Sequence, residues 1–187
     1  MHSEREVTIQ LWRNHIYEEI LNWFAFICLC GGLALLIMLS VVDMKTRLLP
    51  NEMVASFAVL GAIFHITTMA SFVSIENIFL GAFIGFSTLF LLRAIANHLY
   101  KTDTLGLGDV KLIAAGGLWL GTDGILLAMS AGAFAGLLHG IFEAFRISKL
   151  TKTPPNFSKL QIPAGPGFSV GLIIVAIYVF WGFSPLK

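Results

Sequence analysis

Two aspartates are the residues of this sequence whose type and surroundings could do chemistry. Asp43 ends a long apolar run within VVDMKTRLLPN, and Asp109 opens another within LGLGDVKL. Burying an ionisable side chain at a membrane boundary costs free energy, so the position of each aspartate needs an explanation. Two carboxylates at the same depth in a membrane can share a proton and a water molecule. One then takes a proton from water while the other, protonated, polarises a peptide carbonyl, as in aspartic proteases.

The alternative is that each aspartate is an ordinary helix-end residue, hydrated among headgroups or paired with Lys45 or Lys111. The residues before Asp109 favour a site. Gly106 and Gly108 permit a turn and the close approach of another backbone. An extended substrate beside the carboxylates is one reason for such an arrangement.

The two carboxylates should not be equivalent. Asp109 lies where a helix begins, and the helix dipole stabilises an anion there; Asp43 lies where a helix ends. We therefore expect Asp109 to be the resting base and Asp43 the resting acid, within a pair that titrates as a unit.

Composition indicates a membrane protein. Of the 187 residues 57% are hydrophobic and 12% are charged, and the mean hydropathy is +0.83. A soluble domain carries about 25% charged residues. These figures exclude disordered and disulfide-stapled classes, and no basic face suggests nucleic acid. Cys28 and Cys30 lack a second pair for zinc, and no H-E-x-x-H occurs, so we expect neither metal nor cofactor.

Six apolar runs predict an all-α, polytopic membrane helix bundle of about six transmembrane helices. Glycines four residues apart should let these helices pack closely within one chain, and they leave the oligomeric state open. We expect residues 1–20 to form an interfacial, amphipathic segment and residues 21–187 the membrane-embedded domain that holds both aspartates. The runs are 21–42, 53–70, 78–96, 110–121, 124–145 and 168–183.

The basic residues predict the topology. With alternating spans, nine of the 12 fall on one side of the membrane, whereas six of the 11 acids fall on the other. The positive-inside rule places the nine in the cytoplasm, so both termini face out and both aspartates lie at the cytoplasmic face. The nine are Lys45, Arg47, Arg93, Lys101, Lys111, Arg146, Lys149, Lys152 and Lys159.

Three ordered motifs resemble those of the type IV prepilin peptidases. GLGDVKL at 106–112 is similar to that family's GxGDxKL signature. Asp43 followed by Leu49-Pro50-Asn51 resembles its first-aspartate motif. IPAGP at 162–166 resembles its IPFGP element, with Ala164 in place of Phe. The resemblance covers about residues 16–183, nearly the whole chain.

The resemblance implies a membrane-embedded aspartic endopeptidase of the bacterial cytoplasmic (inner) membrane. Such enzymes cut the short basic leader of prepilins or pseudopilins after a glycine, on the cytoplasmic side, and the new N-terminus is apolar. Its partners would be that substrate and the lipid bilayer. The resemblance implies that Asp43 and Asp109 are the catalytic residues. It implies that the residues supporting the substrate or the loop are Gly106, Gly108, Lys111, Pro50, Asn51, Pro163, Gly165 and Pro166.

Bifunctional members of that family carry a cytoplasmic domain with two CxxC pairs and methylate the new amine from S-adenosylmethionine. Cys28 and Cys30 do not form such pairs. We therefore expect peptidase activity without methyl transfer.

Two other functions fit the residues less well. Presenilin-like or signal-peptide-peptidase-like GxGD proteases carry Tyr-Asp in mid-span and Pro-Ala-Leu, whereas here Val42 precedes Asp43 and the element is Pro-Ala-Gly-Pro. A non-enzymatic carrier or channel subunit would hold its paired acids at mid-membrane depth, whereas the sequence places Asp43 and Asp109 at span ends.

Overall fold

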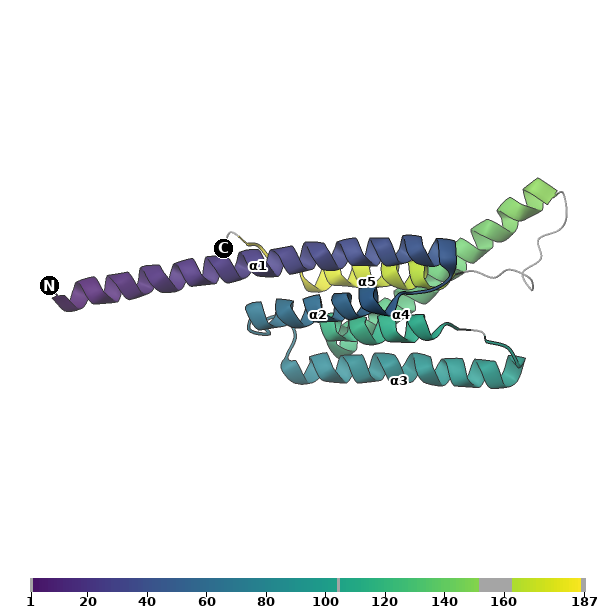
Figure 1. Cartoon of the computed structure of the whole chain (residues 1–187), viewed down its shortest axis with the longest axis horizontal. Helices are drawn as coiled ribbons and strands as arrows, with labels where there is room; N and C mark the ends of the chain where they lie inside the picture. The colour runs from purple at the N-terminus through teal and green to yellow at the C-terminus, as the bar shows by residue number, and fades with distance from the viewer. Residues whose placement is uncertain (1, 104, 152–162, 186–187) are drawn as a thin grey trace.

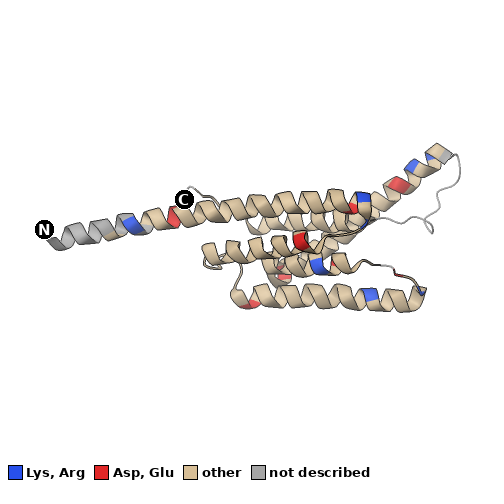
Figure 2. Ribbon diagram, in the orientation of Figure 1, with Lys and Arg blue, Asp and Glu red and all other residues tan. Residues whose placement is uncertain are grey.

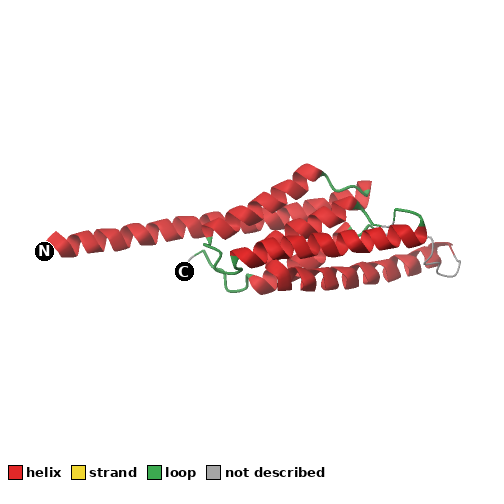
Figure 3. Cartoon of the chain, turned by 90° about the horizontal axis from the view of Figure 1, so that it is seen from below, coloured by secondary structure: helices red, strands yellow, loops and turns green. Residues whose placement is uncertain are grey.

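The computed structural model describes residues 2–103, 105–151 and 163–185. Within those ranges every regular element is a helix, as Figure 3 shows, so the all-α prediction is confirmed. The predicted cytoplasmic residues Lys152 and Lys159, and also Ile162 of the third motif, lie outside the described residues. The helices are α1 (His2–Thr46), α2 (Asn51–Thr67), α3 (Ile75–Tyr100), α4 (Leu107–Thr151) and α5 (Gly165–Val179).

The helices have the length and the surface of an integral membrane protein. Three segments, His15–Thr46, Ile75–Tyr100 and Leu107–Leu150, are long and apolar enough to cross a membrane, whereas α2 and α5 are shorter apolar helices. Large apolar side chains face outward, as Phe79 and Phe83 do on α3. Such an apolar exterior is expected where lipid replaces water as the solvent.

Helix α4 is a hairpin of two arms. Gly121 has φ 67° and ψ −170°, a backbone conformation open to glycine. A methyl group built on Gly85 would lie 3.1 Å from both Ile113 Cγ2 and Ile125 Cγ1. In a straight helix those isoleucines would be about 18 Å apart, so the chain must reverse between them. The arms correspond to the predicted segments 110–121 and 124–145, and the number of helices that cross the membrane stays a prediction.

Some predicted boundaries differ from the observed ones. Helix α2 ends at Thr67 rather than at residue 70, because Met69 and Ala70 adopt positive φ angles in a turn. Helix α5 begins at Gly165 rather than at residue 168, since Pro166 suits the first turn of a helix. Helix α1 runs without a break past residue 20 and extends beyond the other helices (Figure 1). The division of function between residues 1–20 and 21–187 stays a prediction.

Glycines hold the helices together. The backbones of Gly81 and Gly117 are so close that a side chain on Gly117 would overlap the Gly81 carbonyl, which joins α3 to α4. A methyl on Gly132 would lie 2.9 Å from Phe168 Cα, and one on Gly171 would lie 2.6 Å from Gly132 N, which joins α4 to α5. The packing role expected of the spaced glycines is confirmed at Gly81, Gly132 and Gly171, and Gly117 adds a contact that was not predicted.

Trp119 fills the space between α1, α2 and α4. Methyl groups on Gly32 and Gly61 would lie 2.8 Å and 2.7 Å from its indole ring. The indole N–H donates to the backbone oxygen of Phe57 at 2.8 Å, and the two rings stack with centroids 5.4 Å apart. With the indole N–H satisfied, Trp119 packs as a rigid apolar wedge.

The glycine contacts predict opposite effects for two equivalent substitutions. Gly171→Ala should lower stability by about 1–3 kcal/mol, because its methyl would overlap the backbone of α4. Gly136→Ala is the control, since a methyl there meets nothing within 4 Å. It should be neutral or gain up to about 1 kcal/mol of helix propensity. Thermal unfolding of the purified variants in detergent measures both; equal effects would contradict this packing.

Candidate active site

Asp43 and Asp109 come together from two helices. Asp43 lies in the last turn of α1, and Asp109 lies in the first turn of α4. Their side chains are only 5% and 7% exposed, and they are close enough for the charge of Asp43 to act on Asp109. The structure therefore unites in one buried site the two residues on which the sequence prediction depends.

A third helix begins at this site. The backbone N–H of Gly165, the first residue of α5, donates to Asp43 Oδ2 at 3.0 Å in a buried hydrogen bond. Figure 1 shows α5 starting beside the last turns of α1. A methyl on Gly165 would lie 2.6 Å from Asp43 Oδ2, so only glycine permits this approach. The carboxylate of Asp43 thus faces the positive end of a helix dipole.

This contact corrects the sequence argument about Asp43. The C-terminal end of α1 by itself disfavours an anion at Asp43. The N-terminus of α5 supplies a charge-assisted hydrogen bond from the opposite direction, and such bonds are about twice as strong as neutral ones. The helix-dipole argument for Asp43 as the resting acid is therefore incomplete.

Asp109 has different surroundings. Its Oδ1 atom is buried and has no hydrogen-bond partner within the described part of the chain. Its Oδ2 atom lies against the Gly106 backbone, where an added methyl would be 3.1 Å away. Buried polar atoms are almost always partnered, so an unpartnered carboxyl oxygen in a site marks a group available to a ligand.

The loop after Asp43 packs on the start of α4. A methyl on Gly108 would lie 2.7 Å from Leu49 Cβ, so the predicted role of Gly108 in close approach is a contact with Leu49. Pro50 caps α2, and Asn51 Oδ1 accepts a hydrogen bond from Lys111 Nζ at 2.9 Å. These contacts hold the starts of α2 and α4 together.

Lys111 therefore serves Asn51 rather than an aspartate. No salt bridge to Asp43 or Asp109 occurs among the residues that the structure describes. The alternative in which the aspartates are helix-end residues paired with Lys45 or Lys111 does not match this arrangement.

The two prolines of the third motif flank the contact with Asp43. Pro163 is half-buried immediately before α5, and Pro166 occupies the first turn of that helix. Proline at this point has its φ angle already set for the helix and needs no hydrogen bond from its nitrogen. Pro166 thereby helps to fix the start of α5 and the direction in which the Gly165 N–H points.

One residue that the sequence did not indicate contacts the loop before Asp109. Arg93 of α3 donates from Nε to the Leu105 carbonyl at 2.7 Å and from Nη2 to Asp103 at 2.8 Å. Asn97 donates to the same Asp103 oxygen at 3.0 Å. In the sequence, Arg93 contributed only as one of the basic residues that predict the topology. An arginine near the end of an apolar helix, ten residues before an aspartate, was the available signal.

His65 is a structural residue. It is buried in the last turn of α2, and its Nε2 lies 3.0 Å from the backbone oxygen of Trp119. The aspartates lie near the opposite end of that helix, beside Pro50. Across the described ranges, no group of three or more His, Cys, Asp or Glu side chains is placed to hold a metal ion.

Comparison with known proteins assigns the chain to a family. The profile of the type IV leader peptidase family matches residues 23–141, which include both aspartates. The prepilin leader peptidase/N-methyltransferase of Pectobacterium carotovorum subsp. carotovorum is 36% identical over 121 residues, which are 63% of this chain and 43% of that protein. The protein of that name from Neisseria gonorrhoeae is 37% identical over 122 residues, 64% of this chain and 41% of its own length.

A third relative of that name, from Dickeya chrysanthemi, is 30% identical over 172 residues, 88% of this chain and 56% of its own length. The chain thus spans about half the length of the curated relatives that it matches. No solved structure matches it significantly. Because the family profile covers more than half of its residues, the chain belongs to the type IV leader peptidase family.

Proposed function

We propose that this chain is an aspartic endopeptidase that removes the leader peptide of type IV prepilins or pseudopilins. Cleavage follows a glycine at the cytoplasmic face of the bacterial inner membrane. The observation that carries the proposal is the pair of buried aspartates at the junction of α1, α4 and α5. Family membership and the names of the relatives support the choice of substrate.

In the proposed mechanism the two aspartates have the reverse of the roles expected from their own helices. Asp43 is the base, because the Gly165 N–H and the start of α5 stabilise its negative charge. It takes a proton from a water molecule as the water oxygen attacks the scissile carbonyl carbon. Asp109 is the acid, and it donates its proton to the carbonyl oxygen.

The tetrahedral intermediate then collapses. Its C–N bond breaks as the new amine takes the proton held by Asp43, and the carboxyl product returns a proton to Asp109. Each aspartate ends in its starting state, so the cycle needs no group beyond the pair and one water.

The distribution of charge supports the proposed cytoplasmic face. Outside the N-terminal part of α1, Figure 2 shows Lys and Arg in the half of the bundle where α1 and α3 end. Asp43 lies in the last turn of α1 and therefore in that half. Excess basic charge marks the cytoplasmic side of bacterial membrane proteins.

Arg93 is a positioning residue in this proposal. Its two hydrogen bonds fix Leu105 and Asp103, and the chain from Leu105 leads through Gly106 to Asp109. With its side chain only 20% exposed, Arg93 ties this loop to α3. The loop position in turn fixes where the Asp109 carboxyl stands.

Loss of either aspartate should abolish cleavage. Asp43→Ala and Asp109→Ala should each lower the rate by at least about a thousandfold, because the two groups act as a unit. Purified protein in liposomes is mixed with a prepilin whose leader ends in Gly, and the product mass is measured. Glu52→Ala removes an exposed carboxylate at the start of α2 and is the matched control. Normal cleavage by either aspartate variant would refute the aspartic mechanism.

The same mass measurement reads methyl transfer as an added mass of about 14 Da in the presence of S-adenosylmethionine. The proposal assigns only peptide cleavage to this chain, so the product should carry no such addition.

Amide substitutions distinguish the two roles. Asp109→Asn should keep more activity than Asp43→Asn, because an amide at 109 can still donate a hydrogen bond to the carbonyl oxygen. An amide at 43 cannot take a proton from water. Single-turnover cleavage rates of the two variants give the comparison. The reverse order would restore Asp109 as the base.

Removal of the Arg93 contacts should affect the chemical step more than binding. Arg93→Met should lower kcat by at least about tenfold with little change in KM, because a small displacement of a catalytic group is costly. Arg93→Lys should recover part of the loss through Asp103 alone. Lys149→Met is the control, an exposed cation near the end of α4. A loss explained by a lowered thermal midpoint, or one shared by the control, would contradict a positioning role.

A further inference from the structure

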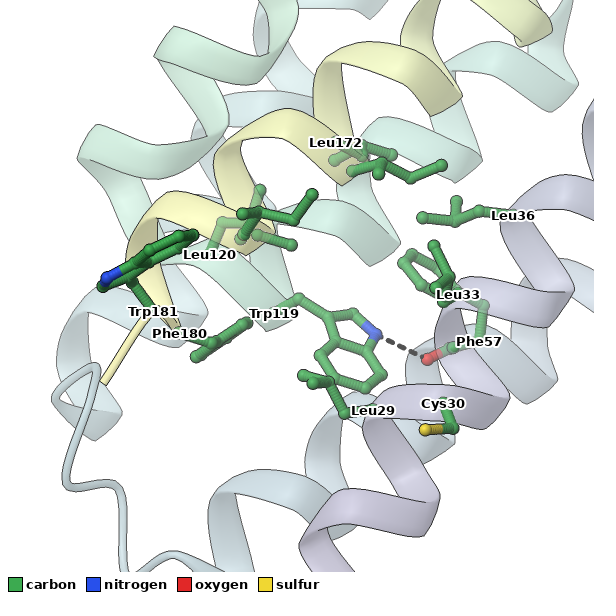
Figure 4. Close-up of a pocket in the computed structure, with 14 residues that line it drawn as sticks. Leu29, Cys30, Leu33, Leu36, Phe57, Trp119, Leu120, Leu172, Phe180 and Trp181 are labelled. Atoms are coloured by element: carbon green, nitrogen blue, oxygen red, sulfur yellow. Dashed lines mark hydrogen bonds between the residues drawn. The ribbon is translucent and has the colours of Figure 1, made fainter. Parts of the chain in front are cut away.

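An apolar cavity of about 330 Å³ lies between α1, α2, α4 and α5. Figure 4 shows Leu33 and Leu36 on the side of α1, Leu172 on the side of α5, and the ring of Trp119 below them. The lining contains no charged side chain, and the indole N–H of Trp119 is already bonded to Phe57. The cavity therefore suits an apolar group that makes no hydrogen bond.

The floor of the cavity is rigid. Trp119 stacks on Phe57 and on Phe64, with ring centroids 5.4 Å and 5.5 Å apart. Gly32 and Gly61 close the two sides of the ring, with room for no side chain. These contacts fix the indole, so this side of the cavity is rigid and is formed in advance of any occupant.

Two helices connect the lining of the cavity to the aspartate site. Leu36 precedes Asp43 by seven residues on α1, and Leu172 follows Gly165 by seven residues on α5. At 1.5 Å per residue both lie about 10 Å from the hydrogen bond between Asp43 and Gly165. The cavity thus lies between the same two helices that meet at Asp43 and Gly165, about two turns farther into the bundle.

The cavity also opens to the lipid. Leu33 of α1 and Ile177 of α5 line it and are exposed on the outer surface of the bundle. An occupant already in the membrane can enter from the side. A whole helix, about 10 Å in diameter, does not fit into 330 Å³, whereas one or two large side chains do.

We infer that this cavity binds one or two large apolar side chains of the substrate segment that follows the scissile bond. The inference rests on the proposed peptidase function and adds to it a second recognition site, within the membrane. A peptide is favoured over a lipid chain because the cavity lies on the same two helices that meet at Asp43 and Gly165. A bound lipid would need no such alignment.

The far end of the cavity supplies a probe. Cys30 lines it and is exposed, whereas Cys28 is buried. Cys30 precedes Asp43 by thirteen residues, so the two lie about 20 Å apart along α1. A substrate covers that distance in about six residues if extended and about thirteen if helical.

The first test blocks the cavity at Cys30. A Cys28→Ala protein is labelled with N-phenylmaleimide and assayed on a full-length prepilin and on a short peptide that ends soon after the scissile bond. The matched control carries Cys28→Ala, Cys30→Ala and Ile37→Cys, because Ile37 is exposed on α1 outside the cavity. We expect the label at Cys30 to raise KM for the prepilin about tenfold. The label would take the place of one substrate side chain in the cavity, and the packing of that side chain would be lost.

With the label at Cys30, kcat and cleavage of the short peptide should stay unchanged. The label at position 37 should change the cleavage of neither substrate. Suppose that unlabelled protein cleaves both substrates. If the Cys30 label then changes the cleavage of neither substrate, or changes the cleavage of both equally, the inference fails and the proposed function stands. If unlabelled protein cleaves neither, the proposed function fails and the inference with it.

The second test maps the contact directly. Single cysteines are placed along the prepilin after the cleavage point, and disulfide cross-links to Cys30 are measured in the Asp109→Ala, Cys28→Ala protein. Cross-linking should peak near the sixth residue after the cleavage point if the substrate is extended, or near the thirteenth if it is helical. The Ile37→Cys control protein, also carrying Asp109→Ala, should show no such peak. A flat profile would overturn the inference. So would a phospholipid with a photoreactive acyl chain that labels the cavity and is not displaced by prepilin.

Discussion

The hydrogen bond from the Gly165 N–H to Asp43 Oδ2 is the contact on which the site depends. It joins the end of α1 to the start of α5 and provides a buried carboxylate with a partner at a helix N-terminus. A lone buried charge would be expensive, and this donor offsets part of that cost. The bond also fixes α5 in register with α1, and the apolar cavity lies between the same two helices.

Close helix packing makes that contact possible. In lipid, apolar side chains gain little by leaving their surroundings, so helices associate where small residues let backbones approach. Gly132 and Gly171 bring α5 against α4, and Gly81 and Gly117 bring α3 against α4. With α3, α4 and α5 packed in this way, the first turn of α4 brings Asp109 to the same end of the bundle as Asp43.

The proposed chemistry follows from the difference between two like residues. Asp43 accepts a hydrogen bond from Gly165 at the start of α5, whereas Asp109 has the Gly106 backbone beside one oxygen and keeps the other oxygen buried and without a partner in the described structure. Two neighbouring buried carboxylates cannot both carry charge at low cost, so their unequal surroundings are the basis of the proposed base and acid roles. In the proposal, the Arg93 contacts position Asp109, and the cavity binds part of the substrate.

The sequence by itself determined the class of protein, the six apolar segments, the spaced glycines and the two aspartates, because these depend on local composition and on short spacings. Only the tertiary structure decided that Gly165 from α5 faces Asp43, that Lys111 binds Asn51, and that α4 doubles back at Gly121. Each of these joins residues far apart in the chain or requires a backbone angle that residue type does not specify. A helix dipole considered along one helix cannot include the dipole of another, so only the fold brings the start of α5 to Asp43.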